Sequence, residues 1–302
     1  MRESAPGIRG GQQRFEVTRF DSGDARSSSD QVAREDALQL MVNGSPLAIL
    51  LRTPGADLEL ALGLLHAEGV ISESGDIDFV RLAPSGQTLL PSTSWEIRQE
   101  PESENLVDVH LRTLLPEGGL GWQRTLPSSS ACGLCGSTTM EAIRQFHQPV
   151  EGRMVWGSEI LFSLPDLLSA SQPVFTTTGG LHAAGLLAWG ATEMKVAEDV
   201  GRHNAVDKLI GRALLERLLP LSNACLIVSG RAGFEIVQKA AAAQIGVVAS
   251  ISAPSSMAVL TAETLGVTLI GFLRGRSCNV YSHPERLGAV VELSPPELEG
   301  DS

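Results

Sequence analysis

The sequence predicts an α/β protein in which a C-terminal domain with a mainly parallel sheet follows a smaller α+β region. Two observations lead to this prediction. In the C-terminal half, short uncharged runs rich in β-branched residues alternate with segments of helical pattern. This alternation is typical of parallel strands joined by right-handed crossovers. The 302 residues are also sufficient for two domains of ordinary size.

Both ends of the chain have the composition of loose segments. Residues 1–35 are rich in Gly, Ser and charge, and we expect a flexible segment that at most enters a strand near Phe15–Arg19. Residues 293–302 are acidic and are expected to form a second flexible tail.

The N-terminal region, residues 36–149, is expected to begin with a hairpin and a helix. Ala37–Val42 and Leu47–Leu51 alternate apolar and polar side chains on either side of Asn43-Gly44, a dipeptide that favours a tight hairpin turn. Leucine and alanine recur at helical spacing in Asp57–His66, and this segment is therefore predicted to be a helix.

The C-terminal domain, residues 150–292, shows the strand–helix alternation most clearly. Its strand-like and helix-like runs are, in chain order, Cys225–Val228, Phe234–Gln244, Val247–Ile251, Met257–Leu265 and Val267–Leu273. If the three strands are parallel, the loops that follow them meet at one edge of the sheet, where open α/β sheets bind their ligands.

The composition of these loops suggests the kind of ligand. The loops are Ser229–Gly233, Ser252–Ser256 and Arg274–Ser277. Their small residues let a ligand approach the backbone, and Arg231, Arg274 and Arg276 add charge that suits phosphate. A nucleotide or pyrophosphate site is one interpretation. Ordinary turns with solvated arginines are the other, and the sequence leaves both open.

Charge and cysteine content narrow the setting. The formal net charge of −12 argues against a general affinity for nucleic acid or for an anionic membrane. The N-terminus lacks the apolar run of a secretory signal, and 4 cysteines in 302 residues do not make a secreted disulfide framework. We therefore expect a cytoplasmic protein with reduced thiols.

Cys132 and Cys135 lie three positions apart in a run of Ser, Ala and Gly. Such a pair can bind a metal, cycle through a disulfide or carry sulfur as a persulfide. A structural zinc site needs four ligands, but Cys225 falls in an apolar run and Cys278 shows no ligand spacing. The helix predicted after the pair favours a thiolate at Cys135 more than at Cys132, so helix position alone does not select the reactive thiol.

Two histidines stand in unusual surroundings. His182 lies among small residues, and His203 lies in the run Glu198–Lys208, which is dense in ionisable groups. A helix with a solvated first turn explains much of this run, and polar recognition is the alternative. Neither histidine has a spacing that identifies a catalytic base.

Taken together, several segments resemble the FdhD family of formate dehydrogenase accessory sulfurtransferases. The segments are Cys132–Gly136, Thr178–Gly185, Glu198–His203, Asp207–Leu209, Ser229–Lys239, Gly271–Arg276 and Tyr281–Leu287. Any one of them is a weak signal, but their order and spacing are specific. The resemblance extends from about Asp36 to Leu287.

The resemblance implies a sulfur carrier. Members of the family accept sulfur from a cysteine desulfurase as a cysteine persulfide, and the carrier position maps to Cys132. They pass the sulfur to molybdenum bis(molybdopterin guanine dinucleotide) before this cofactor enters formate dehydrogenase. The cofactor-binding run maps to Phe272, Leu273, Arg274, Gly275, Arg276 and Ser277. The chain lacks the proline that a common form of this motif has near Arg274, so the location of the site is better defined than each contact.

The resemblance also implies a fold similar to that of cytidine deaminases, without their zinc motif, and it suggests a homodimer. A rival interpretation from another class is a zinc-stabilised chaperone that binds and delivers the cofactor without transferring sulfur.

Overall fold

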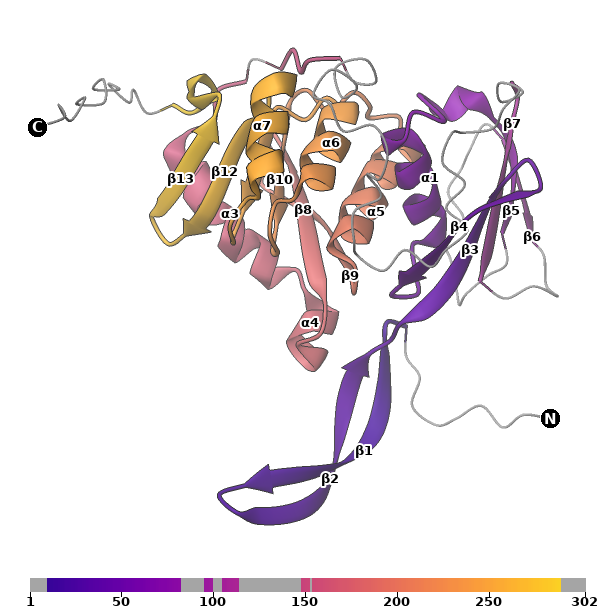
Figure 1. Ribbon diagram of the computed structural model, residues 1–302, viewed down its shortest axis with the longest axis vertical. Helices are drawn as coiled ribbons and strands as arrows, with labels where there is room; N and C mark the ends of the chain where they lie inside the picture. Colours follow the sequence, from indigo (N-terminus) through magenta and orange to yellow (C-terminus); the bar gives the residue numbers. More distant parts are fainter. Residues whose placement is uncertain (1–9, 83–94, 100–104, 114–147, 153, 289–302) are drawn as a thin grey trace, which may run out of the picture.

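The computed structural model describes residues 10–82, 95–99, 105–113, 148–152 and 154–288. Two mixed β-sheets lie on either side of a pair of helices, α1 (Asp57–Ala67) and α5 (Arg202–Leu215) (Figure 1). The fold is therefore mixed α/β, as the sequence predicts. Likeness to cytidine deaminases stays a prediction.

The C-terminal sheet has six strands within the described residues. Their spatial order is β13 (Ser277–Ser282), β12 (Thr268–Arg274), β11 (Val247–Ser250), β10 (Ala224–Val228), β8 (His182–Ala188) and β9 (Lys195–Asp199). The three predicted strands, β10 to β12, are confirmed and are parallel to one another. The prediction of a mainly parallel sheet is wrong, because the other three pairings are antiparallel. The sequence pattern missed the connections from β8 to β9 and from β12 to β13, which are hairpins without a crossover helix.

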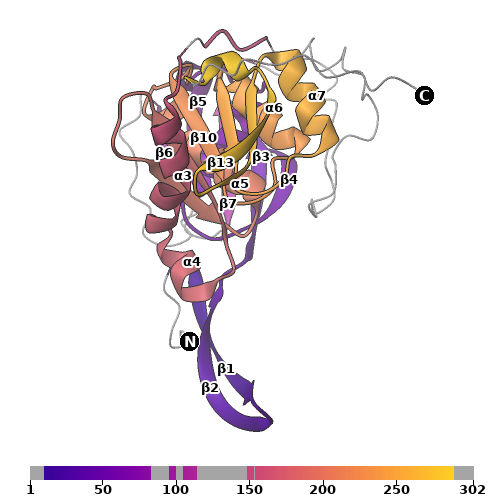
Figure 2. The same ribbon diagram turned by 90° about the vertical axis from the view of Figure 1, so that its left-hand side faces the viewer.

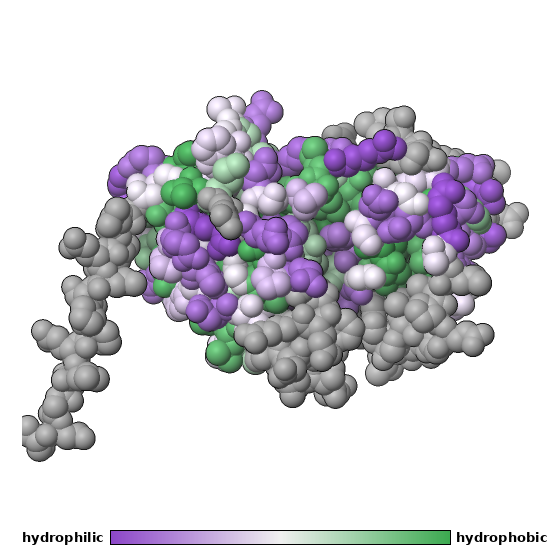
Figure 3. All heavy atoms as spheres, turned by 90° about the horizontal axis from the view of Figure 1, so that it is seen from above, coloured by the Kyte–Doolittle hydropathy of each residue, from purple (hydrophilic) through white to green (hydrophobic). Residues whose placement is uncertain are grey.

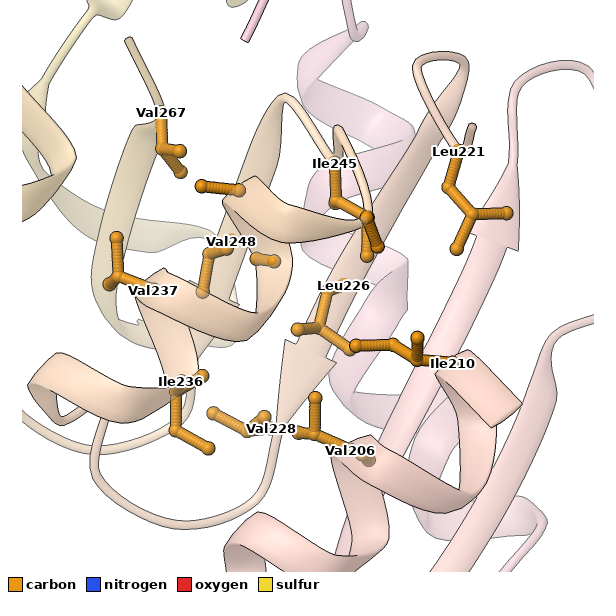
Figure 4. Close-up of a cluster of buried hydrophobic side chains, with 14 of the residues drawn as sticks. Val206, Ile210, Leu221, Leu226, Val228, Ile236, Val237, Ile245, Val248 and Val267 are labelled. Atoms are coloured by element: carbon orange, nitrogen blue, oxygen red, sulfur yellow. The ribbon is translucent and has the colours of Figure 1, made fainter. Parts of the chain in front are cut away.

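Helices cover both faces of this sheet. On one face lie α5, α6 (Phe234–Ala242) and α7 (Ser256–Leu265), and on the other lies α3 (Ser158–Ala170). The short α4 (Pro173–Thr178) follows α3 and lies below the sheet in Figure 1. Strand β10 is buried on both faces. Leu226 and Val228 point to α5 and α6 (Figure 4), whereas Cys225 and Ile227 pack in the cluster that contains α3. Such uncharged strands are typical of a sheet covered on both sides.

The N-terminal sheet has five strands within the described residues. Their order is β4 (Ser45–Arg52), β3 (Asp36–Val42), β7 (Leu106–Leu111), β5 (Ile77–Leu82) and β6 (Glu96–Gln99). The predicted hairpin is confirmed, and Asn43 and Gly44 both have positive φ in its turn. The predicted helix is confirmed as α1, which packs its leucines on this sheet. The described residues also contain two short 3-10 helices, η1 (Ser74–Asp76) and η2 (Pro284–Arg286).

Helices α1 and α5 approach each other through two glycines. A Cβ on Gly63 of α1 would lie 1.9 Å from the carbonyl oxygen of Asp207, and a Cβ on Gly211 of α5 would lie 1.8 Å from that of Glu59. Real Cβ atoms do not come this close, so the two backbones touch because neither glycine has a side chain. This contact fixes the distance between the two sheets.

A buried polar junction reinforces the same contact. The Asp199 carboxylate at the end of β9 lies 2.7 Å from Nζ of Lys208 and accepts a hydrogen bond from the Thr53 N–H at 3.1 Å. Lys208 also donates to the Thr53 carbonyl, and Asn204 donates to the carbonyl of Leu51 and to Asp199. Each buried charge thus has partners, which is the condition under which burial is tolerated.

Residues 12–33 differ from the expected loose segment. They form a regular antiparallel hairpin of β1 (Gln12–Asp21) and β2 (Asp24–Ala33), which projects from the body (Figure 2). Its base lies beside α4, where Thr177 donates a hydrogen bond to Gln12. The prediction from composition was wrong for these residues, because the backbone hydrogen bonds between β1 and β2 order a sequence that is rich in Ser and charge.

The surface seen from above mixes polar and charged residues with smaller apolar areas (Figure 3). In the part of the chain that the structure describes, no helix is long and apolar enough to cross a membrane.

Candidate functional site

The candidate site is the edge of the C-terminal sheet at which β10, β11 and β12 end. Because β8 is antiparallel to β10, its first residue, His182, lies at this edge, and the pairing of His182 with Asp199 brings the end of β9 there too. It is the lower edge of the sheet in Figure 1, above α4. The predicted convergence of the three loops is confirmed, and the starts of β8 and α5 join them.

The run Phe272–Ser277 forms the β12–β13 turn at one end of this edge. Leu273 is fully buried in the core below the edge, so it anchors the turn. Phe272 has a φ of 53° and remains 40% exposed, although it is a large aromatic residue. A left-handed conformation is strained for a residue with a side chain, and such strain is common at ligand sites.

The two arginines of this turn have different surroundings. Nε of Arg274 donates to the Ile251 carbonyl at 2.9 Å, and its terminal nitrogens have no partner among the described residues. Arg276 forms a bidentate ion pair with Glu159 of α3, and its guanidinium lies 5.6 Å from the centroid of the Phe162 ring. Arg274 is thus the arginine whose guanidinium is positioned and still available to an anion.

The loops after β10 and β11 are bonded to each other. Ala232 and Pro254 form a parallel bridge, Ser250 Oγ donates to the Gly230 carbonyl at 2.8 Å, and Ser255 caps α7 by accepting from Ala258 N–H. The serines therefore hold the edge together, which is the turn role that the sequence left open. Arg231 is exposed on this loop.

His182 and His203 lie near each other at the opposite end of the edge. Nδ1 of His203 lies 3.2 Å from Oε2 of Glu235. Burial lowers the pKa of His203 to about 4, with Glu235 opposing this shift and Arg202 adding to it. Burial also lowers the pKa of His182, and the charge of Arg202 acts in the same direction. Both imidazoles are therefore neutral at neutral pH.

The run Glu198–Lys208 divides into two sets. Asp199 and Lys208 belong to the buried junction described above, and Asp207 forms a buried ion pair with Lys239 of α6 at 2.8 Å. Burial raises the pKa of Asp207 to about 6, and Lys239 partly offsets the effect. Arg202 and His203 instead face the edge. The sequence pointed to His203, but it gave no role to Arg202 or Glu235, which lie on different helices.

Cys132 and Cys135 lie outside the described residues, so the structure does not test them. The two described cysteines are poor nucleophiles: burial raises the pKa of Cys225 far above its usual range and also raises that of Cys278. Within the described ranges, no three His, Cys, Asp or Glu side chains gather closely enough to hold a metal.

The C-terminal domain thus has an open α/β sheet with arginines and an exposed aromatic at the carboxyl edge of its parallel strands, the place where sheets of this class bind ligands. The chain belongs to the FdhD/NarQ family, whose model matches residues 33–288. The resemblance stated from the sequence is thereby confirmed.

Curated relatives match over most of their length. The chain is 43% identical over 278 residues to "Sulfur carrier protein FdhD" of Streptomyces coelicolor, covering 91% of this chain and 95% of that protein. The protein of the same name in Sulfolobus acidocaldarius is 40% identical, with 91% and 98% covered. A crystal structure described as that of a candidate formate dehydrogenase accessory protein from Desulfotalea psychrophila has the same fold. Its TM-score is 0.68 at 22% identity, with 91% of this chain and 99% of that chain covered.

Proposed function

We propose that this protein is a sulfur carrier in the maturation of formate dehydrogenase. The observation that supports this most strongly is membership of the FdhD/NarQ family together with the pair Cys132-Gly133-Leu134-Cys135. Relatives at 40 to 44% identity bear the name sulfur carrier protein. The two described cysteines are less suited to the task because burial raises the pKa of both thiols.

The donor in this proposal is a cysteine desulfurase. The Cys132 thiolate attacks the outer sulfur of the desulfurase persulfide, the S–S bond breaks, and the desulfurase cysteine leaves as a thiolate. Cys132 then carries the sulfur as a persulfide. Its thiolate form is the reactive one, and the choice of Cys132 over Cys135 rests on the family resemblance, because the predicted helix would favour the thiolate of Cys135 more.

The acceptor is molybdenum bis(molybdopterin guanine dinucleotide), held as cargo on the sheet edge. In the transfer the S–S bond breaks and the outer sulfur forms a bond to molybdenum; the metal gives up two electrons, the sulfur is reduced to the sulfide level, and Cys132 leaves as a thiolate. Phe272 offers an exposed ring on which a guanine base can stack, and Arg274 offers a free guanidinium to a phosphate. Arg276 already has a carboxylate partner, so a phosphate would have to replace Glu159.

The setting of this proposal is the cytoplasm, with the desulfurase and formate dehydrogenase as protein partners. A homodimer stays a prediction.

The test is a pair of variants given a persulfide-loaded desulfurase. Cys132→Ala is expected to take up no sulfane sulfur and to leave formate dehydrogenase inactive, whereas Cys225→Ala, at a buried site, serves as the matched control and is expected to keep both activities. If Cys132→Ala still accepts sulfur and still activates formate dehydrogenase, the assignment is wrong. Stoichiometric zinc that is lost on Cys132→Ser would instead support the metal-stabilised chaperone.

A further inference from the structure

A second group of side chains stands at the far end of the same sheet edge, away from Phe272–Ser277. It consists of His182 at the start of β8, Arg202 and His203 at the start of α5, and Glu235 in the first turn of α6. These residues come from three separate stretches of the chain. The fold alone brings them together.

Arg202 is partly buried, yet it has no hydrogen-bond partner in the described part of the chain. Its Nε is shielded from solvent, and no acceptor in the described part of the chain lies within hydrogen-bonding distance. A buried polar group without a partner is costly, and a guanidinium can only donate. The missing partner is therefore an acceptor, and an anion supplies the strongest one.

The close neighbours of Arg202 at this end of the edge are His182 and Gly230. A Cβ on Gly230 would lie 3.2 Å from Nδ1 of His182 and 3.6 Å from Cδ of Arg202, so the backbone of Gly230 lies close to both side chains. His182 also has no hydrogen-bond partner in the described residues. Glu235 is engaged by His203, and the exposed Arg231 on the same loop as Gly230 adds a second positive charge.

We propose that Arg202 and His182, on either side of Gly230, form a subsite for a phosphoryl group of the cargo. The N-terminus of the 14-residue helix α5 lies beside them: its N-cap, Gly201, offers no side chain to the first N–H groups of the helix, and the N–H of Gly201 itself donates to Asp199. The proposal rests on the proposed function, which supplies a cargo with several phosphates.

The position of the subsite along the edge fits an extended cargo. Strands β11 and β10 separate β12 from β8. At a spacing of about 4.8 Å per strand, the two ends of the edge are about 14 Å apart. The β12–β13 turn and the Arg202 subsite can therefore contact different parts of one ligand that carries two nucleotides.

The test measures binding of inorganic pyrophosphate by titration calorimetry to the full chain. Arg202→Gln is expected to lower the affinity about tenfold or more, because a charge-assisted bidentate contact is lost. Arg202→Lys keeps the charge but not the fork and is expected to lose less. Arg212→Gln, which removes the same charge from the last turn of α5, is the matched control and is expected to bind like wild type. GDP is expected to compete with pyrophosphate in wild type.

Thermal melting establishes that the variants are folded, and sulfur uptake at Cys132 is measured in parallel. Unchanged uptake with weakened pyrophosphate binding supports the subsite. Equal affinity of wild type and Arg202→Gln, an equal loss in Arg212→Gln, no binding to wild type, or no competition by GDP would each overturn it. If wild type takes up no sulfur, the proposed function is contradicted. The pyrophosphate result still decides whether Arg202 binds an anion.

Discussion

Two sets of charged residues in one short run, Glu198–Lys208, have opposite surroundings. Asp199 and Lys208 are almost completely buried and bonded to each other and to Thr53, whereas Arg202 has a shielded Nε without a partner among the described residues. The first set joins the two sheets. The second faces the sheet edge where ligands are expected. Density of charge in a sequence thus does not separate a structural junction from a binding site, but the partners of each charge do.

The largest expected effect comes from breaking the helix contact that supports the junction. Gly211→Val would place a Cβ 1.8 Å from the Glu59 carbonyl, so α5 and α1 would have to separate. We expect a loss of at least about 4 kcal/mol in unfolding free energy, or no folded protein, measured by urea unfolding. Gly157→Ala, where nothing lies within 4 Å, is the control. Equal stability of the two variants would contradict the described packing.

Next in size is the loss of one charge from the junction. Asp199→Asn leaves Lys208 buried without its carboxylate, and such a change costs about 3–5 kcal/mol. Arg202→Gln removes a charge from the second set and is expected to change the unfolding free energy by less than about 1 kcal/mol, because no described residue pairs with it. Comparable losses in the two variants would show that the two sets do not differ as the structure indicates.

A pH-dependent effect distinguishes His203. Its pKa is about 4 in the folded protein and 6.5 ordinarily, so the unfolded chain binds a proton first as the pH falls. Stability is therefore lost between pH 6.5 and about 4, by roughly 3 kcal/mol in total. In His203→Gln this loss should be absent from the pH profile of urea unfolding. Asp207, with its raised pKa, acts in the opposite direction but is present in both proteins. If the pH profiles of wild type and His203→Gln run parallel, the lowered pKa of His203 is contradicted.

The smallest effect on stability is expected at the β12–β13 turn. The ion pair of Arg276 with Glu159 is exposed, and such pairs contribute little. Arg274→Ala and Arg276→Ala should therefore leave the urea midpoint unchanged while weakening GDP binding. Arg26→Ala, on the exposed tip of the β1–β2 hairpin, is the control and should bind GDP normally. Unchanged GDP affinity in both turn variants would move the nucleotide site elsewhere.

Much of the fold follows from local pattern. The hairpin around Asn43-Gly44, helix α1 and strands β10 to β12 were predictable because turn chemistry and hydrophobic period agree in these segments. The pattern indicated at most a strand near Phe15–Arg19 and missed the hairpin of β1 and β2, most of whose side chains are polar. It also missed the antiparallel strands β8 and β13, because strand direction depends on which connections lack a helix.

Prediction of the site was limited for a similar reason. The sequence marked Phe272–Ser277 and His203, and the structure places both at one edge. Arg202 was visible within the run Glu198–Lys208. Its surroundings were not, because Gly230 and His182, which lie beside it in the fold, are far away in the chain. Gly230, in the loop after β10, was a local feature of the sequence that could have drawn attention to this site.

The most direct test of the proposed carrier role is mass spectrometry of the intact and digested protein after incubation with a cysteine desulfurase and cysteine. We predict a gain of one sulfur atom located on Cys132. Cys225 and Cys278 should remain unmodified, because burial raises the pKa of both thiols. Sulfur found on either of these two residues, or on no cysteine of a protein that activates formate dehydrogenase, would contradict the account.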